Sequence, residues 1–480
     1  MKNRFGFLII LLLFFSSAGW AQQEFQVKSS VERNSVSART YMEGLAPGEG
    51  LPALPKGPLF LTGTKPEQLT ADYWIKRLPD PDRILKTPAQ LKFFNQEIRA
   101  MTRERVDIFE PGILPAGTEI RNQIKLEYET ISGRKLFDIE NVYVPKKFFE
   151  VAIKPTMNWE SVPNPLVLKW GAATRATSVR ALPTHVKMLE EKGDIEFDQL
   201  QFTLIKLWTP VAVLHTSQDG KWHYVQAPYV RGWVQSKYIA LFPSRKALKE
   251  KVQSDQFLVV TGESISVYSD PSYQEEFQKP TMGTVLPLVQ KNDTGYTVEM
   301  PIRSKGGDVL LKKYYVRRDS DVHVGFPPYT QRNIIRQAFK LLGARYGWGG
   351  MYNGRDCSGF THDIFLSMGV DLPRDSDQQT LVGTQLGYFR PGEDVETKTA
   401  ALRFATPGIA LLKMPMHMML YLGEMDGRFF VIHSTWAERI SMTSDEKNRI
   451  NQVVVSDLSL NGRSYLGSLF DRTVGINELD

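Results

Sequence analysis

Three side chains in the last third of the chain could together carry out nucleophilic catalysis. Cys357 is the single cysteine among 480 residues, and seven histidines are present. Two of these, His417 and His433, stand at the start of one apolar run and late in the next. A thiol, an imidazole that takes its proton and a second group that orients the imidazole form a known catalytic arrangement. Spacing alone is a weak signal, because seven histidines offer many such pairs.

The residues around Cys357 predict that it begins a helix. Asp356 precedes it in the position of a helix cap, and Phe365 and Met368 follow on a short helical segment. Unpaired N–H groups and the helix dipole at such a start favour a thiolate, so we expect the pKa of Cys357 to lie below the usual value of about 8.5. The alternative is an inert buried thiol, with Asp356 acting only as a cap.

Three apolar runs beyond Cys357 predict strands, at residues 408–414, 417–425 and 428–436. Side chains alternate along a strand, so a two-residue turn of Asp426 and Gly427 would place His417 and His433 on opposite faces. A three-residue loop over 425–427 would place both histidines on one face, with Gly427 in the left-handed conformation. We predict that loop, or another of odd length.

The composition excludes several classes of protein. A net charge of +6 over 480 residues indicates an ordinary solvated surface, so we expect no nucleic-acid partner. The glycines near residues 347–350 lack the Gly-Lys-Ser/Thr that a phosphate-binding loop requires. After the first residues no segment is long and apolar enough to span a membrane.

The first 21 residues have the pattern of a secretory signal peptide. A basic start is followed by an apolar run from Phe5 to Phe15 and by small residues at Gly19 and Ala21. No cysteine follows that could carry a lipid anchor. We therefore expect an exported, soluble protein of the periplasm or the cell exterior, where a lone thiol cannot staple the fold through a disulfide.

Changes in pattern divide the remaining chain. A polar stretch rich in Pro and Gly predicts a flexible leader. Thr87, Pro88 and Gln90 predict the start of a helix, and dense short strands further on predict two small barrels, with Trp222, Tyr224 and Trp233 in the core of the first. The predicted divisions are a leader at 22–57, a helical N-terminal domain at 58–150, barrels at 151–245 and 250–326, and a C-terminal domain at 329–480.

Several motifs resemble those of the NlpC-type (p60-type) cell-wall cysteine peptidases. In order they are RYGWGGMYNGRDCSGF, LPRDSDQQ, MHMMLYLG and VIHST. Upstream, YWIKRLPDPDRILKTPAQLKFFNQ and FDQLQFTLIKLWTPVAVLHTSQDGKWHYVQ resemble, more loosely, multidomain members with two bacterial SH3-like domains. The resemblance implies an α+β fold: a papain-like catalytic domain preceded by two all-β SH3-like barrels and a helical N-terminal segment. A long insertion between Leu381 and Phe404 departs from the family pattern.

The resemblance also implies roles for individual residues. Cys357 would be the nucleophile, His417 the base and His433 the orienting residue, with no metal and no cofactor. The positions that line the family's substrate pocket are Tyr346, Asp356, Ser358, Asp375 and Ser376. Asp375 and Ser376 could instead only cap a helix. We expect the other histidines to be structural: His185, His215, His223, His323 and His362.

The implied reaction is hydrolysis of the γ-D-glutamyl–diamino acid bond in peptidoglycan stem peptides. The partners would be peptidoglycan or released muropeptides, and we expect a monomer. In relatives with this domain order an acidic residue at the position of Asp375 helps to receive the free amine of L-alanine. The resemblance therefore implies a preference for peptides already released from the glycan. It also leads us to expect a buried carboxylate at Asp375. Two alternatives are a muramoyl-peptide amidase or thiol acyltransferase using the same thiol, and a wall-binding protein without catalytic activity.

Overall fold

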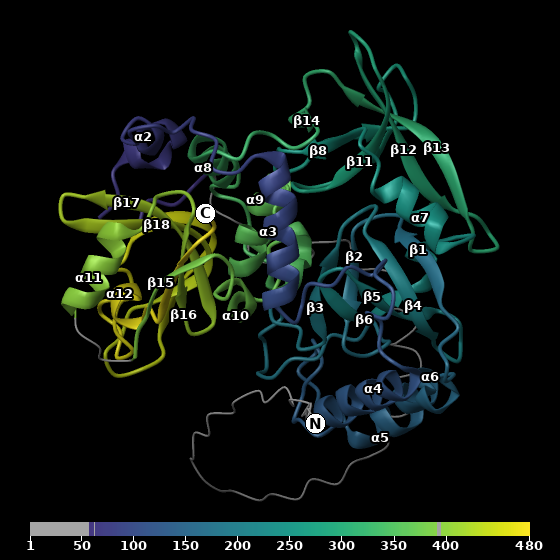
Figure 1. Cartoon of the computed structure of the whole chain (residues 1–480). Helices are drawn as coiled ribbons and strands as arrows, with labels where there is room; N and C mark the ends of the chain where they lie inside the picture. The colour runs from purple at the N-terminus through teal and green to yellow at the C-terminus, as the bar shows by residue number, and fades with distance from the viewer. Residues whose placement is uncertain (1–56, 62, 391–394) are drawn as a thin grey trace, which may run out of the picture. The chain divides into compact units, whose positions relative to one another are not determined.

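The computed structural model describes residues 57–61, 63–390 and 395–480 (Figure 1). The expected signal peptide and all but the last residue of the expected leader lie outside these ranges. The first part of the described chain is helical. Its elements are η1 (Pro66–Leu69), α2 (Ala71–Ile75), α3 (Pro88–Met101), α4 (Gly117–Ser132), α5 (Lys146–Phe148), η2 (Phe149–Ile153), α6 (Lys154–Met157) and η3 (Trp159–Ser161).

Helix α3 begins where its sequence predicts. The Thr87 side chain accepts from the backbone N–H of Gln90, the Gln90 side chain reaches back to the backbone N–H of Thr87, and Pro88 occupies the first helical position. These contacts satisfy N–H groups that the first turn of a helix leaves unpaired.

The first sheet is antiparallel and has seven strands. They are β1 (Lys169–Ala173), β2 (Thr177–Arg180), β3 (Gln201–Ile205), β4 (Pro210–Thr216), β5 (Trp222–Ala227), β6 (Val230–Gln235) and β7 (Ile239–Phe242), in the order β3-β2-β6-β5-β4-β1-β7. The short helix η4 (Ser236–Tyr238) precedes β7. Trp222, Tyr224 and Trp233 are buried, as expected for core residues of this unit.

A second antiparallel sheet of seven strands follows the helix α7 (Arg245–Val252). Its strands are β8 (Phe257–Val260), β9 (Val267–Tyr268), β10 (Glu276–Gln278), β11 (Val285–Lys291), β12 (Gly295–Arg303), β13 (Val309–Arg317) and β14 (Val322–Val324), in the order β10-β9-β13-β12-β11-β8-β14. Two curled all-β units therefore precede the C-terminal part, which agrees with the expected pair of SH3-like barrels.

The C-terminal part combines helices with a six-stranded sheet. Its helical elements are α8 (Gln331–Lys340), η5 (Trp348–Asn353), α9 (Cys357–Ser367), α10 (Ser376–Gln379), α11 (Val395–Phe404) and α12 (Leu469–Arg472). Its strands are β15 (Thr384–Tyr388), β16 (Ala410–Met414), β17 (His417–Met425), β18 (Arg428–Arg439), β19 (Lys447–Asp457) and β20 (Gly475–Glu478), in the order β15-β20-β16-β17-β18-β19. The expected α+β class is confirmed. The insertion after Leu381 supplies β15 and α11.

The helical segment at the start of the described chain contributes to two different cores. Leu91, Phe94 and Ile98 of α3 pack in the same apolar cluster as Phe360 and Ile364 of α9, and Figure 1 shows α3 beside α9. Helix α4 instead packs in the cluster that contains the core of the first sheet. The N-terminal helices thus pack against both the C-terminal domain and the first barrel. The residue boundaries given for the domains stay predictions.

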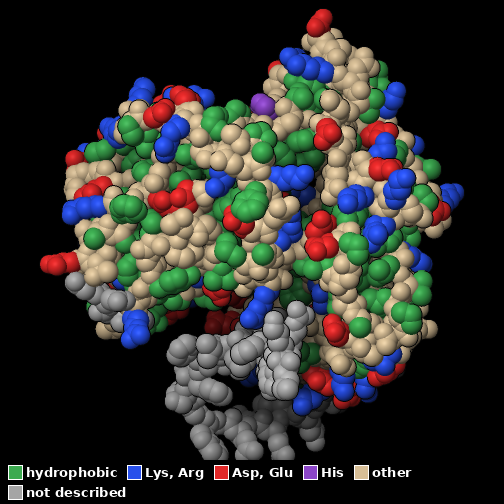
Figure 2. All heavy atoms as spheres, viewed as in Figure 1, with side chains coloured by type: hydrophobic (Ala, Val, Ile, Leu, Met, Phe, Trp, Pro, Cys, Tyr) green, Lys and Arg blue, Asp and Glu red, His purple; other side chains and the backbone are tan. Residues whose placement is uncertain are grey.

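Charge on the visible surface is mixed. On the face drawn in Figure 2, basic and acidic side chains alternate without a large field of one sign. Such a mixture of charges is typical of an ordinary solvated surface. None of the helices built from the described residues has the length and apolar character needed to cross a membrane.

Candidate active site

Cys357 is the first residue of α9, as its neighbours predict. The Asp356 side chain caps the helix by accepting from the backbone N–H of Gly359 at 2.8 Å. Its second oxygen accepts from the N–H of Gly349 at 2.8 Å and from Arg374 Nη2 at 2.6 Å. The loop before α9 and Arg374, which lies just before α10, are thereby fixed to the residue that precedes the thiol.

The thiol lies against the start of β17. Cys357 Sγ is 3.9 Å from the carbonyl oxygen of Met416, and the backbone N–H of Met418 donates to the sulfur. The sulfur therefore lies alongside the backbone of His417, the residue between these two. Cys357 and His417 are each only 8% exposed.

His417 and His433 are directly hydrogen-bonded. The distance from His417 Nε2 to His433 Nδ1 is 2.6 Å, and His433 Nε2 lies 3.0 Å from Ser456 Oγ. If each Nε2 carries the proton, the chain runs from His417 through His433 to the Ser456 hydroxyl. That set of tautomers leaves Nδ1 of His417 as a free base, which is what a proton acceptor for a thiol needs.

The two histidines share one face of the sheet for a reason other than the predicted loop. β17 and β18 are joined by the two-residue turn of Asp426 and Gly427, with Met425 opposite Arg428, so the prediction of a loop of odd length is wrong. The register shifts between Tyr421 and Gly423, where Leu422 is an extra residue. This bulge reverses the alternation of side chains.

Burial sets the charge state of the site. It raises the pKa of Cys357 to about 11, and the negative charge of Asp356 adds to the rise. Burial, followed by the charges of His433 and Lys413, lowers the pKa of His417. Burial also lowers the pKa of His433 to about 3. The resting site therefore holds a neutral thiol and neutral imidazoles, the reverse of the thiolate expected from the helix start.

The residues expected to line the substrate pocket lie around the thiol and α10. Tyr346 is buried, and its pKa is raised by burial and by the nearby Cys357 and Asp356. Ser358 accepts from Arg374 Nη1 at 2.9 Å. Asp375 caps α10 by accepting from the N–H groups of Asp377 and Gln378.

Asp375 differs from its expectation in one respect. The sequence-based argument took it for a buried carboxylate, and the structure leaves it exposed. The more shielded acid nearby is Glu104, whose carboxylate accepts from the backbone N–H of Asp375 at 2.8 Å. Burial, together with the charge of Asp375, raises the pKa of Glu104 to about 7.

Sequence reasoning missed several residues that shape the site. Arg374 stands inside a quoted motif, so only its role was overlooked, whereas the others lie outside every motif. These are Glu104, Glu196, Lys413 and Ser456. No local signal in the sequence could have brought them to the thiol, because each arrives from a different element.

A loop of the first barrel packs against the C-terminal domain. Glu196 is 6% exposed and accepts from Arg345, Asn451 and Trp436 at 3.2, 2.8 and 2.8 Å. The ring of the next residue, Phe197, lies 6.2 Å from that of Tyr346. One edge of the site therefore depends on the barrel.

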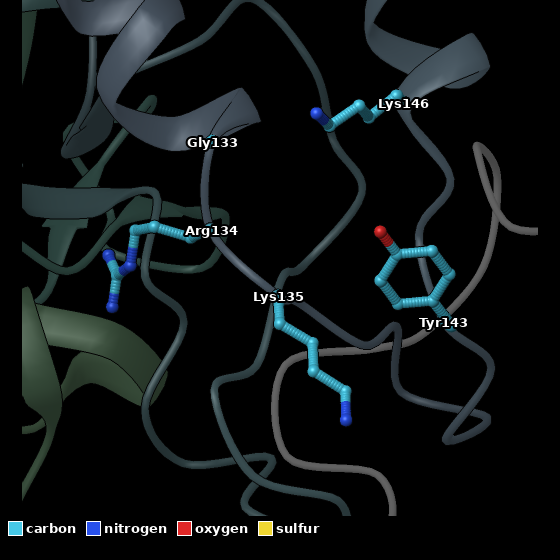
Figure 3. A pocket seen from close by; sticks show the side chains of 5 residues that line it. All are labelled: Gly133, Arg134, Lys135, Tyr143 and Lys146. Carbon is cyan, nitrogen blue, oxygen red and sulfur yellow. The ribbon is translucent and has the colours of Figure 1, made fainter. Parts of the chain in front are cut away.

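A separate hollow lies at the end of α4. It has a volume of about 410 Å³, and Figure 3 shows its side chains: Arg134, Lys135, Tyr143 and Lys146, with Gly133. None of the candidate site residues lines this hollow. The described residues also contain no cluster of His, Cys, Asp and Glu suited to a metal.

Comparisons with known proteins find family models that match two parts of the chain. Residues 343–458 match the model of the NlpC/P60 family, and residues 186–235 match that of an SH3 domain of the SH3b1 type. The C-terminal domain is therefore an NlpC/P60 domain, and an SH3-like domain precedes it.

Two curated relatives are similar over parts of their length. A gamma-D-glutamyl-L-lysine dipeptidyl-peptidase of Bacillus cereus is 30% identical over 156 residues, which are 32% of this chain and 44% of that protein. The Bacillus subtilis protein of the same name is 34% identical over 21% of this chain and 31% of its own length. This chain thus spans less than half of the curated relatives it matches.

One solved structure resembles nearly the whole chain. It is an NlpC/P60 endopeptidase from Photobacterium damselae subsp. piscicida, with a TM-score of 0.68 and 16% identity, covering 89% of this chain and 98% of that one. At this identity the likeness concerns the fold.

Proposed function

We propose that this protein is a cysteine peptidase that cleaves the γ-D-glutamyl–diamino acid bond of peptidoglycan stem peptides. The observation that carries the proposal is the placement of Cys357 Sγ alongside His417, whose Nε2 is 2.6 Å from His433. The names of the two Bacillus relatives describe the same bond type, with lysine as the diamino acid.

In the proposed mechanism His417 acts through Nδ1. It takes the proton of Cys357 as the sulfur attacks the γ-carbonyl carbon, so that charge develops only when substrate is bound. The N–H groups of Gly359 and Phe360 are already taken by Asp356. Those of Cys357 and Ser358, at the start of α9, are the ones that can meet the oxyanion.

The later steps return the site to its starting state. The imidazolium of His417 gives its proton to the leaving amine, and an acyl-enzyme remains on Cys357. Water, deprotonated by His417, then hydrolyses this thioester and releases the D-glutamate γ-carboxylate. His433 and Ser456 hold the imidazole in one orientation throughout.

Selection of released peptides would use two acids. The backbone N–H of Asp375 donates to Glu104, and a substrate ammonium from L-alanine would add a cation to the charges of Arg374 and Arg105 that already act on Glu104. A peptide still attached to muramic acid carries an uncharged amide there and would not supply that cation. Because the pKa of Glu104 is about 7, this preference should weaken as the pH falls below that value.

The proposal is tested with defined peptides. L-Ala-γ-D-Glu-diamino acid peptides and their N-acetylated forms are incubated with wild type, Cys357→Ala and Asp375→Asn, and the products are weighed by mass spectrometry. We expect cleavage after γ-D-glutamate, none by Cys357→Ala, and a preference for the free amine that Asp375→Asn reduces. Equal cleavage of both peptides would overturn the amine site. Cleavage of muropeptides between the lactyl group of muramic acid and L-alanine would indicate an amidase.

Export and quaternary state belong to the same proposal. The signal-peptide pattern at residues 1–21 and the family of the domain support a secreted, soluble protein that works on the wall, and we propose that it is a monomer. N-terminal sequencing of the mature protein, with cleavage expected after Ala21, and light scattering of the purified protein check these two points.

A further inference from the structure

Lys413 is a buried lysine beside the candidate triad. It lies on β16 next to Met414, the residue that pairs with His417 across the sheet. Its side chain is only 7% exposed. Burying an ammonium is costly unless partners compensate it, so its partners indicate what it does.

Both partners of the ammonium belong to α10. Lys413 Nζ donates to Ser376 Oγ at 2.7 Å and lies 2.7 Å from Asp377 Oδ1. The Asp377 side chain is 78% exposed, so water screens much of its charge. Within the part of the chain that the structure describes, the third hydrogen of the ammonium has no partner.

Ser376 adds a second donor at the same place. Because Lys413 donates to Ser376 Oγ, that oxygen is the acceptor and the hydroxyl hydrogen remains to be given. A cationic N–H and an O–H side by side are suited to the two oxygens of a carboxylate.

The charge of Lys413 also acts on the catalytic groups. It opposes the rise that burial and Asp356 cause in the pKa of Cys357. After burial and His433, it is the next cause of the lowered pKa of His417. Lys413 pairs across the sheet with Met418, whose backbone N–H donates to Cys357 Sγ, so it is close enough to the thiol to contact a substrate that is bound there.

The proposed substrate carries a carboxylate near the bond that is cleaved. D-Glutamate joined through its γ-carboxyl keeps a free α-carboxylate a few bonds from the carbonyl carbon that Cys357 would attack. We propose that Lys413 and Ser376 bind this α-carboxylate and make the enzyme select γ-linked glutamate over its α-amide, isoglutamine. This inference rests on the proposed function.

The test compares two peptides that differ only in that group. L-Ala-γ-D-Glu-L-Lys and L-Ala-γ-D-isoGln-L-Lys are given to wild type, Lys413→Met and Lys413→Arg. Wild type should favour the carboxylate by about tenfold to a hundredfold in kcat/KM, since a hydrogen-bonded charge pair is lost with the amide. Lys413→Met should bring the two peptides within about threefold, and Lys413→Arg should keep most of the preference.

Lys398→Met is the matched control. Lys398, on α11, is also buried, at 3% exposed, and donates to the backbone carbonyls of Phe470 and Asp471 in α12. Losing a buried ammonium there should leave the ratio of kcat/KM for the two peptides as it is in wild type. If Lys413→Met fails to fold, wild type alone decides the matter, because L-Ala-D-Glu should protect Cys357 from alkylation better than L-Ala-D-isoGln.

The outcomes that overturn this inference differ from those that overturn the proposed function. Cleavage of both peptides by wild type at equal rates, or an unchanged preference in folded Lys413→Met, would remove Lys413 from substrate selection and leave the peptidase intact. Cleavage of neither peptide would instead remove the proposed function, and this inference with it.

Discussion

At the scale of single residues, the charge state of Cys357 decides how the site can work. A helix start favours a thiolate, but the sulfur is buried and stands next to Asp356, and the result is a pKa of about 11. Removal from water outweighs the helix dipole here. The ion pair of thiolate and imidazolium would then form only as substrate binds.

This charge state gives the first prediction, which concerns alkylation. Because the thiol is neutral below its raised pKa, the rate of labelling by iodoacetamide should rise steadily from pH 6 to beyond pH 9, without a plateau near neutrality. Cys357 is the single cysteine, so Cys357→Ala gives the blank. A midpoint below about 8.5 would show that an ion pair already exists in the free protein.

The second prediction concerns His433 as the orienting residue. In the proposed set of tautomers His433 Nδ1 accepts from His417 Nε2. His433→Asn keeps an acceptor near that point and should retain activity within about tenfold, whereas His433→Leu should lose about a hundredfold or more in kcat. KM should change little in either variant. Equal loss in both would mean that the hydrogen bond does not orient His417.

At the scale of elements, an irregularity in β17 brings the histidines to one face. The tight turn at Asp426 and Gly427 would separate them, since the two residues adopt the left-handed conformation of a regular hairpin turn, with φ of 52° and 72°. The extra residue Leu422 restores the alignment. Bulges often re-aim a side chain near an active site.

The third prediction follows from the conformation of this bulge. Gly423 has φ of 124°, which side-chain-bearing residues rarely adopt, and an added Cβ would meet only Pro407 at an ordinary 3.5 Å. Gly423→Ala should therefore cost about 1–3 kcal/mol of stability through backbone strain. Gly306→Ala, whose added Cβ also has no close neighbour, should change it by less than about 0.5 kcal/mol. Thermal unfolding of the two variants compares them, and equal stabilities would show that the bulge is not strained.

At the scale of the whole molecule, the first barrel and the C-terminal domain meet through Glu196. This buried carboxylate accepts from Arg345, Asn451 and Trp436 and pairs with Arg449. Residues far apart in the sequence thus contact one carboxylate. The next residue, Phe197, lies beside Tyr346 at the edge of the site. The contact between the first barrel and the C-terminal domain therefore lies at the edge of the candidate site.

The fourth prediction removes the charge of this group. Glu196→Gln should lower stability by about 1–3 kcal/mol, because Arg345 and Arg449 lose the buried anion that they share. Glu190→Gln is the matched control, since Glu190 is 62% exposed and pairs with Arg134 at 3.2 Å, and should cost less than about 1 kcal/mol. Differential scanning calorimetry, which resolves separate transitions, measures both. The same loss in both variants would count against a buried interface at Glu196.

Local patterns in the sequence determined much of this protein. The cap at Thr87, the helix start at Asp356, the core aromatics of the first barrel and the motifs around Cys357 each depend on neighbours within a few residues. Such features can be read from short windows, because propensity, capping and periodicity act locally.

Tertiary structure alone decided the rest. No residue pattern around Leu422 indicates the bulge, so the sequence predicted a loop of odd length where the structure has a two-residue turn. The high pKa of Cys357 comes from burial by several elements, and Glu104, Glu196, Lys413 and Ser456 reach the site from segments remote in the chain. Burial and long-range pairing depend on how the whole chain packs, which no short window of sequence contains.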